Sequence, residues 1–234
     1  MKPRVSVVVP VRNEGQAIED FLDRLFERVT VPLEVLAVYG SELDPTAPCL
    51  EAYALSEARL HPVLNPAAAG PAQALRFALR HAEADVIVVI MGDGSDDPSQ
   101  IEPLARLVER GVAVAAASRY MQGGQQVGGP FLKSLVSRVA GVSLYWMARV
   151  GTRDAINTFK AYDRAFLDDV GIDSPVGFEM GLELVAKARR RGLPVAELPT
   201  IWLDKGATPP TYRIWAWVPR YLRWYGHSFG RPRA

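Results

Sequence analysis

A run of β-branched residues near the start of the chain constrains its fold more than any other feature. Residues 5–11 read VSVVVPV, and a run that is apolar on both alternating faces is typical of a strand buried on both sides of a parallel sheet. Proline has no backbone N–H, so Pro10 fits only where that strand ends. Apolar residues then recur at helical spacing over residues 14–29. We therefore expect a buried strand that leads into an amphipathic helix.

The alternation of strand and helix continues along the chain. The same patterns predict further strands at residues 33–39, 61–65, 85–91, 112–120 and 195–203, and helices at residues 44–58, 70–84, 98–111, 131–150 and 178–192. Strands that alternate with helices form a parallel sheet covered on both faces, so we predict an α/β fold. Four glycines fall within residues 121–130, where we expect a mobile loop.

The composition is that of one globular domain. The chain has 234 residues, 49% of them hydrophobic, which suffices to bury a core without cross-links. There is no Ser- or Gly-rich linker and no internal repeat, so residues 1–234 are predicted to form a single domain. The single cysteine, Cys49, excludes an internal disulfide, and no cysteine–histidine cluster suggests zinc. Neither a signal peptide nor a transmembrane helix is predicted, and we expect a cytoplasmic protein.

The C-terminal segment, residues 206–234, interleaves aromatic and basic residues. The whole chain has a net charge of +1, yet every charged residue from Lys205 onward is basic. Tryptophan and tyrosine favour the membrane interface and arginine favours anionic headgroups. We therefore predict a peripheral contact with the inner face of a membrane, made by a helix that begins near Pro219. The alternative is that the rings pack against the sheet and the arginines extend into solvent. The residues concerned are Trp215, Trp217, Tyr221, Trp224, Tyr225, Arg213, Arg220 and Arg223.

Three aspartates directly follow the predicted strand at residues 85–91. Asp93, Asp96 and Asp97 repel one another unless a cation neutralises them, and no basic residue lies nearby in the sequence. The carboxyl ends of parallel strands line one crevice, where a hard divalent cation takes one or two carboxylates together with substrate phosphates. We predict that Asp93 and Asp96 hold such a cation. For Asp96 and Asp97 the alternative is that they cap the following helix.

Four segments resemble, in this order, the family 2 glycosyltransferases, and among them the dolichol-phosphate mannose synthase-like branch. They are VSVVVPVRNEG, GPAQALRFALRHAEADVIVVIMGDGSDDP, ASRYMQGG and DAINTFKAYDRAFLD. The resemblance extends from residue 5 to about residue 225. It implies a GT-A (Rossmann-like) fold and an inverting hexosyltransferase that uses a GDP- or UDP-linked sugar with Mg²⁺ or Mn²⁺. A polyprenyl phosphate is often the acceptor in this family, and nucleic acid is not an expected partner.

The resemblance also assigns nucleotide-binding residues. Tyr39 stands where the family has an acid, and its ring is expected to stack on the base. The other positions that match the family's nucleotide motifs are Pro10, Arg12, Asn13, Glu14 and Asp44. Apart from the resemblance, Arg12 to Glu14 fit a turn before a helix, and Asp44 or Thr46 fits the N-terminal cap of the helix over residues 44–58.

Four further residues are assigned to the transfer step. Arg119 matches a family arginine in the crevice, and its planar guanidinium suits bidentate phosphate binding; the alternative is a surface ion pair. Lys205 matches a base in the family's closing segment. With the metal, Arg119 or Lys205 is expected to stabilise the leaving diphosphate. A hydroxyl acceptor requires a base, for which Asp154 and Glu179 are candidates, whereas a phosphate acceptor requires none. Ser137 and Arg138 match the family's helix near the acceptor phosphate.

Two other classes of protein remain open at this point. Met91 stands where the family has the first acid of an Asp-x-Asp pair, which leaves a catalytically inactive, nucleotide-binding homologue as one alternative. A sugar-phosphate nucleotidyltransferase is the other. Such enzymes open with a glycine-rich basic loop after the first strand, whereas PVRNEG contains one glycine.

Overall fold

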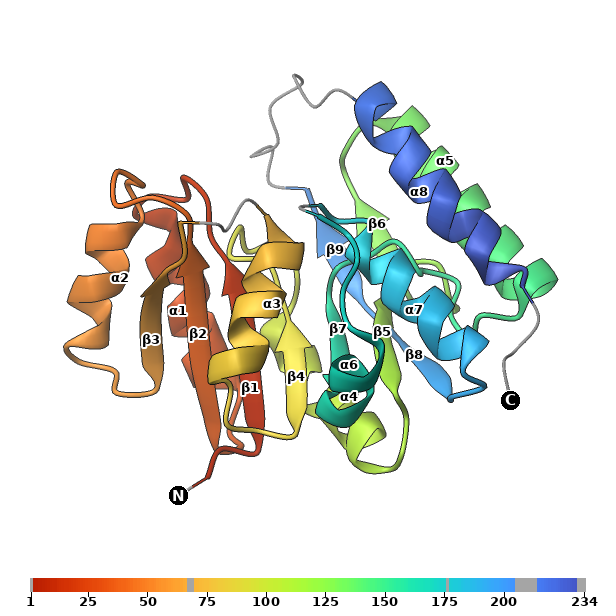
Figure 1. The fold of residues 1–234 in the computed structure, drawn as a ribbon. Helices are drawn as coiled ribbons and strands as arrows, with labels where there is room; N and C mark the ends of the chain where they lie inside the picture. Colours follow the sequence, from red (N-terminus) through yellow and green to blue (C-terminus); the bar gives the residue numbers. More distant parts are fainter. Residues whose placement is uncertain (1, 67–69, 176, 205–213, 231–234) are drawn as a thin grey trace.

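The computed structural model describes residues 2–66, 70–175, 177–204 and 214–230. Its centre is a seven-stranded sheet in the order β3-β2-β1-β4-β7-β5-β8 (Figure 1). Its strands are β1 (Val5–Pro10), β2 (Leu33–Tyr39), β3 (Leu60–Leu64), β4 (Val86–Val89), β5 (Val114–Ser118), β7 (Lys160–Asp163) and β8 (Val195–Pro199). Neighbouring strands are parallel except for β7, which is antiparallel to both β4 and β5. The prediction of a mostly parallel sheet is confirmed.

Helices cover both faces of this sheet, as predicted. They are α1 (Ala17–Arg28), α2 (Ala47–Ala54), α3 (Pro71–His81), α4 (Ile101–Glu109), α5 (Phe131–Ser143), α6 (Arg164–Val170), α7 (Met180–Arg190) and α8 (Ile214–Ser228), with a 3₁₀ turn η1 (Pro98–Gln100) and a π-helical turn η2 (Leu144–Ala148). Alternate residues of β1 point to opposite faces. Val7 belongs to the core under α1, α2 and α4, whereas Val8 belongs to the core under α3, α6 and α7.

The sequence pattern did not predict β7 or the helix α6 that follows it. β7 has only four residues, and the first of them, Lys160, is fully buried. Because a lysine interrupts the apolar run expected of a central strand, periodicity gives no signal there. The strand matters for the site, since an antiparallel β7 begins at the edge of the sheet where β4 and β5 end.

Residues 121–130, predicted as a mobile loop, contain a short strand. β6 (Gln125–Val127) pairs in parallel with β9 (Ile201–Leu203), so the strand predicted over residues 195–203 is two strands that separate at Thr200. A Cβ atom on Gly124 would overlap the carbonyl oxygen of Ser118, which explains the need for glycine there. The mobility of this loop stays a prediction.

The C-terminal helix α8 packs on the domain through its aromatic side chains. It begins at Ile214 and contains Pro219, so the predicted start near Pro219 is wrong. Trp224 is buried in the core, and the Tyr225 hydroxyl lies 2.9 Å from Ser143 Oγ at the end of α5. For these two rings the alternative of inward packing is correct. Among the described segments, no helix has both the length and the apolar character needed to cross a bilayer.

Candidate functional site

The carboxyl ends of β1, β2, β4 and β5 meet at one edge of the sheet, where the amino end of β7 joins them. The loops that leave this edge carry the residues predicted for the site. Arg213 and Lys205 lie outside the described residues, as do the side chains of Trp215 and Trp217.

The loop after β1 is held in place by the loop after β2. The backbone N–H of Asn13 donates to both carboxylate oxygens of Asp44, at 3.2 and 3.1 Å, and the N–H of Gly15 donates to Thr46 Oγ1 at 3.0 Å. Asn13 has a φ of 59°, a left-handed conformation that asparagine tolerates better than most residues. Thr46 occupies the N-cap position of α2 but makes no side-chain cap hydrogen bond. Of the two residues predicted as possible caps, Thr46 does not cap the helix, whereas Asp44 Oδ1 accepts from the N–H of Thr46 at 2.9 Å. Asp44 and Thr46 therefore hold the two loops together.

Three acidic side chains gather where these loops approach β4. Burial, together with the charges of Asp93 and Asp44, raises the pKa of Glu14 to about 7. Pro10 is buried at the end of β1, whereas Arg12 is exposed. The crevice is thus acidic on the side of β1, β2 and β4, as a site for a cation requires.

Tyr39 does not face this crevice. Its side chain is 6% exposed and packs in the core under α1, α2 and α4. Burial, followed by the charge and hydrogen bond of Glu51, raises the pKa of its hydroxyl. Because the ring is enclosed, the predicted stacking of Tyr39 on a nucleotide base does not fit this structure.

The aspartates after β4 have different surroundings. Asp97 accepts a hydrogen bond from the N–H of Ser99 at the start of η1 and pairs with Arg28, so for Asp97 the capping alternative is correct. Asp96 is 3% exposed, and within the described part of the chain its Oδ1 has no hydrogen-bond partner. Burial, and next the charge of Asp93, raises the pKa of Asp96 to about 7. Asp93 accepts from the N–H of Ser95 at 2.9 Å and is half-buried.

These residues fit a divalent cation that takes part of its coordination from a ligand. Within the described residues, no group of three or more His, Cys, Asp or Glu side chains is arranged to hold a metal alone. Asp93 and Asp96 do supply carboxylate oxygens, one of which is buried without a partner. Mg²⁺ binds in this way, through one or two carboxylates with phosphates and water completing the shell.

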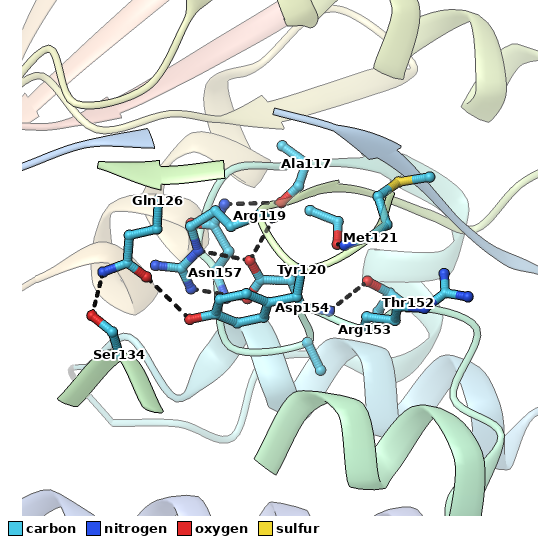
Figure 2. Close-up of polar contacts among 12 residues, drawn as sticks. Ala117, Arg119, Tyr120, Met121, Gln126, Ser134, Thr152, Arg153, Asp154 and Asn157 are labelled. Carbon is cyan, nitrogen blue, oxygen red and sulfur yellow. Dashed lines mark hydrogen bonds and ion pairs between the residues drawn. The ribbon is translucent and has the colours of Figure 1, made fainter. Parts of the chain in front are cut away.

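Arg119, predicted to bind phosphate, pairs instead with Asp154 (Figure 2). Its Nε donates to Asp154 Oδ2 at 2.7 Å, its Nη2 to Oδ1 at 2.9 Å and its backbone N–H to Oδ2 at 3.0 Å. Burial lowers the pKa of Arg119, but the charge and hydrogen bonds of Asp154 outweigh burial and hold that pKa above its ordinary value. Asp154 is fully buried. The alternative of a surface ion pair is therefore wrong, whereas phosphate binding by Arg119 stays a prediction, with Nε and Nη2 occupied by Asp154 in this structure.

A pocket of about 310 Å³ lies at the opposite end of the sheet, around Glu34 and His61, but a larger one adjoins Arg119. The larger pocket has a volume of about 610 Å³. Figure 2 shows part of its wall, in which Gln126 Nε2 donates to Ser134 Oγ at 2.6 Å and the Tyr120 hydroxyl donates to Gln126 Oε1 at 3.3 Å. The lining includes Arg119, Tyr120, Gly128, Gly129, Phe131, Ser134, Leu135 and Arg138. Because Asp154 neutralises the charge of Arg119, Arg138 is the lining residue that supplies positive charge for an anion, together with the polar groups of the wall.

Two buried charged residues lie near this edge. In the sequence, Lys160 was missed and Glu179 was recognised only as a candidate base. Burial lowers the pKa of Lys160 to about 7, against the opposing charge of Asp154. Glu179, at the start of α7, is fully buried, and neither of its carboxylate oxygens has a hydrogen-bond partner among the described residues. Arg220 lies at an N–O distance of 3.9 Å from Glu179. The sequence signal for Lys160 was its place between the apolar residues Phe159 and Ala161.

The chain is similar to two proteins whose names describe the transfer of mannose. Polyprenol monophosphomannose synthase of Mycolicibacterium smegmatis is 25% identical over 210 residues, which cover 86% of this chain and 78% of that protein. Dolichol-phosphate mannosyltransferase of Pyrococcus furiosus is 24% identical over 191 residues, which cover 80% of this chain. The match spans only 53% of the Pyrococcus protein, about half of its length.

Solved structures share the fold. The mannosyltransferase PcManGT from Pyrobaculum calidifontis, in complex with GDP-Man and Mn²⁺, has a TM-score of 0.64 and 21% identity, over 98% of this chain and 64% of its own. Glucosyl-3-phosphoglycerate synthase from Mycobacterium tuberculosis, in complex with Mn²⁺, UDP and glucosyl-3-phosphoglycerate, has a TM-score of 0.69 and 18% identity, over 99% of this chain and 82% of its own. These likenesses establish the GT-A fold. The model of the family "Glycosyl transferase family 2" matches residues 6–171, most of the chain, and the protein belongs to that family.

Proposed function

We propose that the protein transfers a hexosyl group, with inversion, from a nucleoside-diphosphate sugar to an acceptor that carries a phosphate. The observation that carries this proposal is that an acidic group and a pocket lined by arginines lie at the same edge of the sheet. On one side, Asp96 has a buried carboxylate oxygen without a partner, next to Asp93. On the other, Arg119 and Arg138 line a pocket. A metal–diphosphate fits the acidic side and an anionic acceptor fits the basic side.

The donor is assigned to the crevice between the loops after β1, β2 and β4. The hydrogen bonds from Asn13 and Gly15 to Asp44 and Thr46 fix the shape of this crevice before any ligand binds. A bound Mg²⁺ or Mn²⁺ would be held by Asp93 and Asp96, and it would neutralise charge that develops on the leaving diphosphate. Guanine and uracil are both candidate bases, because one structural neighbour is a complex with GDP-Man and another is a complex with UDP.

The acceptor is assigned to the pocket beside Arg119. A phosphate oxygen is already anionic, so it attacks the sugar without a protein base. This fits Asp154, whose oxygens are occupied by hydrogen bonds from Arg119 and Asn157. A polyprenyl phosphate has the required chemistry, and the names of both curated relatives refer to polyprenol or dolichol phosphate.

An apolar surface beside the pocket supports a lipid acceptor and a peripheral contact with a membrane. We call it the α5 face. Phe131 and Leu135 both line the pocket and are exposed, and the surface continues along α5 and η2. It comprises Phe131, Leu135, Val136, Val139, Trp146 and Met147. The exposed Arg138 and Arg149 lie on the same segment and complement anionic headgroups. We therefore assign the proposed membrane contact to the α5 face and not to the aromatic rings of α8.

Nucleotide binding tests the proposal. Isothermal titration with GDP and UDP, with and without Mn²⁺, is expected to give tighter binding of one nucleotide when Mn²⁺ is present. Asp93→Asn should abolish this Mn²⁺-dependent gain. Asp97→Asn is the matched control, because asparagine also caps a helix and Asp97 is bonded to Ser99 and Arg28. Release of the nucleoside diphosphate from a panel of sugar nucleotides, with polyprenyl phosphate added, then reports transfer.

The outcomes distinguish an active transferase from an inactive homologue and from a protein that binds no nucleotide. Binding without turnover of any sugar nucleotide would identify an inactive homologue. Unchanged affinity of Asp93→Asn in Mn²⁺ would remove Asp93 from the metal site. A wild-type protein that binds neither nucleotide would overturn the proposed function.

A further inference from the structure

Lys160 is a buried cation whose hydrogen bonds, among the described residues, go to backbone carbonyls and not to a carboxylate. Its side chain is fully enclosed at the first position of β7, aligned with Val89 of β4 and Ala116 of β5. Its Nζ donates to the carbonyl oxygen of Ala155 at 3.2 Å and to that of Asn157. A buried ammonium is costly unless its hydrogen bonds are satisfied, so its retention at the centre of a sheet points to a specific task.

Both carbonyls belong to the loop that holds Arg119. Residues 154–157 connect the pair Arg119–Asp154 to β7, and the N–H of Asn157 donates to Asp154 Oδ1 at 3.3 Å. The Asn157 side chain donates to the carbonyl of Ala117, the residue two before Arg119, at 2.9 Å (Figure 2). The loop is thus bonded to Lys160 on one side and to the end of β5 on the other.

Helix α7 closes the space around this ammonium. A Cβ atom on Gly181 would lie 2.9 Å from the carbonyl oxygen of Asn157 and 3.3 Å from Lys160 Nζ. The charged groups that act on Lys160 are Asp154 in its own loop, Arg119 after β5 and Asp96 after β4. Lys160 is therefore enclosed between α7 and the loop of residues 154–157.

We propose that Lys160 is a positioning residue: through its hydrogen bonds to the loop of residues 154–157, it fixes Asp154 and hence the guanidinium of Arg119 at the wall of the pocket. Without the ammonium, the carbonyls of Ala155 and Asn157 lose their donor and the loop is free to shift. Asp154 then no longer aligns with Nε and Nη2 of Arg119. The geometric part of this inference stands alone, and only its effect on acceptor binding rests on the proposed function.

Lys187 provides a matched control. Its Nζ also donates to two loop carbonyls, those of Val170 and Gly171, at 3.1 and 3.0 Å. Lys187 is also paired with Asp173 and Glu183. Among the described hydrogen bonds and ion pairs, the loop at residues 170–171 makes no contact with Arg119. Replacing either lysine by methionine removes the same kind of interaction, but only Lys160→Met is expected to disturb the pocket.

The test follows the Arg119 Nε–H signal by NMR. In Lys160→Met, solvent exchange of this proton should be roughly tenfold faster than in the wild type, because its acceptor is no longer held. Lys187→Met should lower the melting temperature and leave that exchange rate unchanged. Titration with inorganic phosphate should show roughly tenfold weaker binding in Lys160→Met alone. If Lys160→Met does not fold, the pair Lys160→Gln and Lys187→Gln is compared instead, with a smaller effect expected because glutamine keeps an N–H donor.

Two results would overturn the proposal. One is an Arg119 exchange rate that is the same in Lys160→Met as in the wild type. The other is an equal acceleration in both methionine variants, which would reflect a general loss of stability. If the wild type binds no phosphate, the proposed acceptor pocket fails, but the exchange rates still decide the role of Lys160.

Discussion

Arg119 and Asp154 form a buried, bidentate ion pair, with N–O distances of 2.7 and 2.9 Å. Asp154 also accepts hydrogen bonds from the backbone N–H groups of Arg119 and Asn157. These four hydrogen bonds hold the carboxylate in one orientation. The pair consequently determines the shape of the pocket, and the chemistry of transfer has to come from other groups.

The first prediction is a strong energetic coupling between these two residues. Either Asp154→Asn or Arg119→Met leaves a buried charge without its partner, and each is expected to lower the free energy of unfolding by about 3–5 kcal/mol. The double variant should lose much less than the sum of the two, because it leaves no isolated charge. Urea unfolding of all four proteins measures the coupling. Additive losses would contradict it.

The second prediction concerns the pH dependence of metal binding. The pKa of Asp96 lies near 7 in the folded protein, compared with an ordinary value of 3.8. Because the folded state holds this proton more tightly, the contribution of Asp96 to stability is present at low pH and is lost as pH rises through about 7. Mn²⁺ has to displace the proton, so its affinity should rise with pH by up to about tenfold per unit below pH 7. Calorimetric titration at several pH values measures this slope.

Asp96→Asn is the control for that experiment. Glu14 also has a pKa raised to about 7, so part of the slope belongs to Glu14. Removing the Asp96 carboxylate should flatten the slope and weaken Mn²⁺ binding together. A slope that is unchanged in Asp96→Asn would assign the whole effect to Glu14.

The third prediction contrasts two buried glutamates of α7. Glu179 has no hydrogen-bond partner for either oxygen, so Glu179→Gln, which removes a buried charge, should leave the melting temperature equal or higher. Glu183 accepts from the N–H groups of Asp173 and Ser174 and pairs with Lys187, so Glu183→Gln should lower it. With a phosphate acceptor, Glu179→Gln should also retain turnover. A loss of about 10²-fold or more would identify Glu179 as a general base and the acceptor as a hydroxyl.

The fourth prediction concerns the α5 face. The paired substitution Val136→Glu and Val139→Glu places charge on two exposed apolar positions, and it should release the protein from anionic liposomes in sedimentation. Arg220→Glu with Arg223→Glu should weaken binding less, because the neighbouring rings of Tyr221 and Trp224 pack on the domain. The valine pair is exposed and should change the melting temperature little, whereas Arg220→Glu places a like charge beside the buried Glu179 and should lower it. If the wild type stays in the supernatant at low salt, the membrane contact is wrong.

Much of the fold follows from periodicity in the sequence. The apolar run at residues 5–11 predicts β1 to within one residue, and the helical spacing over residues 14–29 predicts α1 to within three. The pattern failed at β7, because four residues beginning with lysine carry no strand signal, and at β6, because glycines are equally compatible with a loop. In both cases the strand exists because a neighbouring strand supplies its hydrogen bonds, and sequence periodicity does not contain that information.

The sequence predicted which residues lie at the candidate site, but it did not predict which of them contact one another. Spacing placed acids after β4 and polar residues after β1. It did not show that Arg119 faces Asp154, that Asp44 binds the backbone of Asn13, or that the ring of Tyr39 points into the core. Each of these relationships joins segments far apart in the chain, and each depends on the twist and order of the sheet.

The antiparallel β7 has a consequence for how the chain comes together during synthesis. β4 and β5 are not neighbours in the sheet, since β7 lies between them. A nascent chain that ends at Ser118 therefore contains β1 to β5 but lacks the strand that joins β5 to the rest. Until residues 160–163 leave the ribosome, one edge of β4 stays open and β5 has no place to dock. β4 and β5, which carry the two halves of the site, are therefore both made before the strand that joins them.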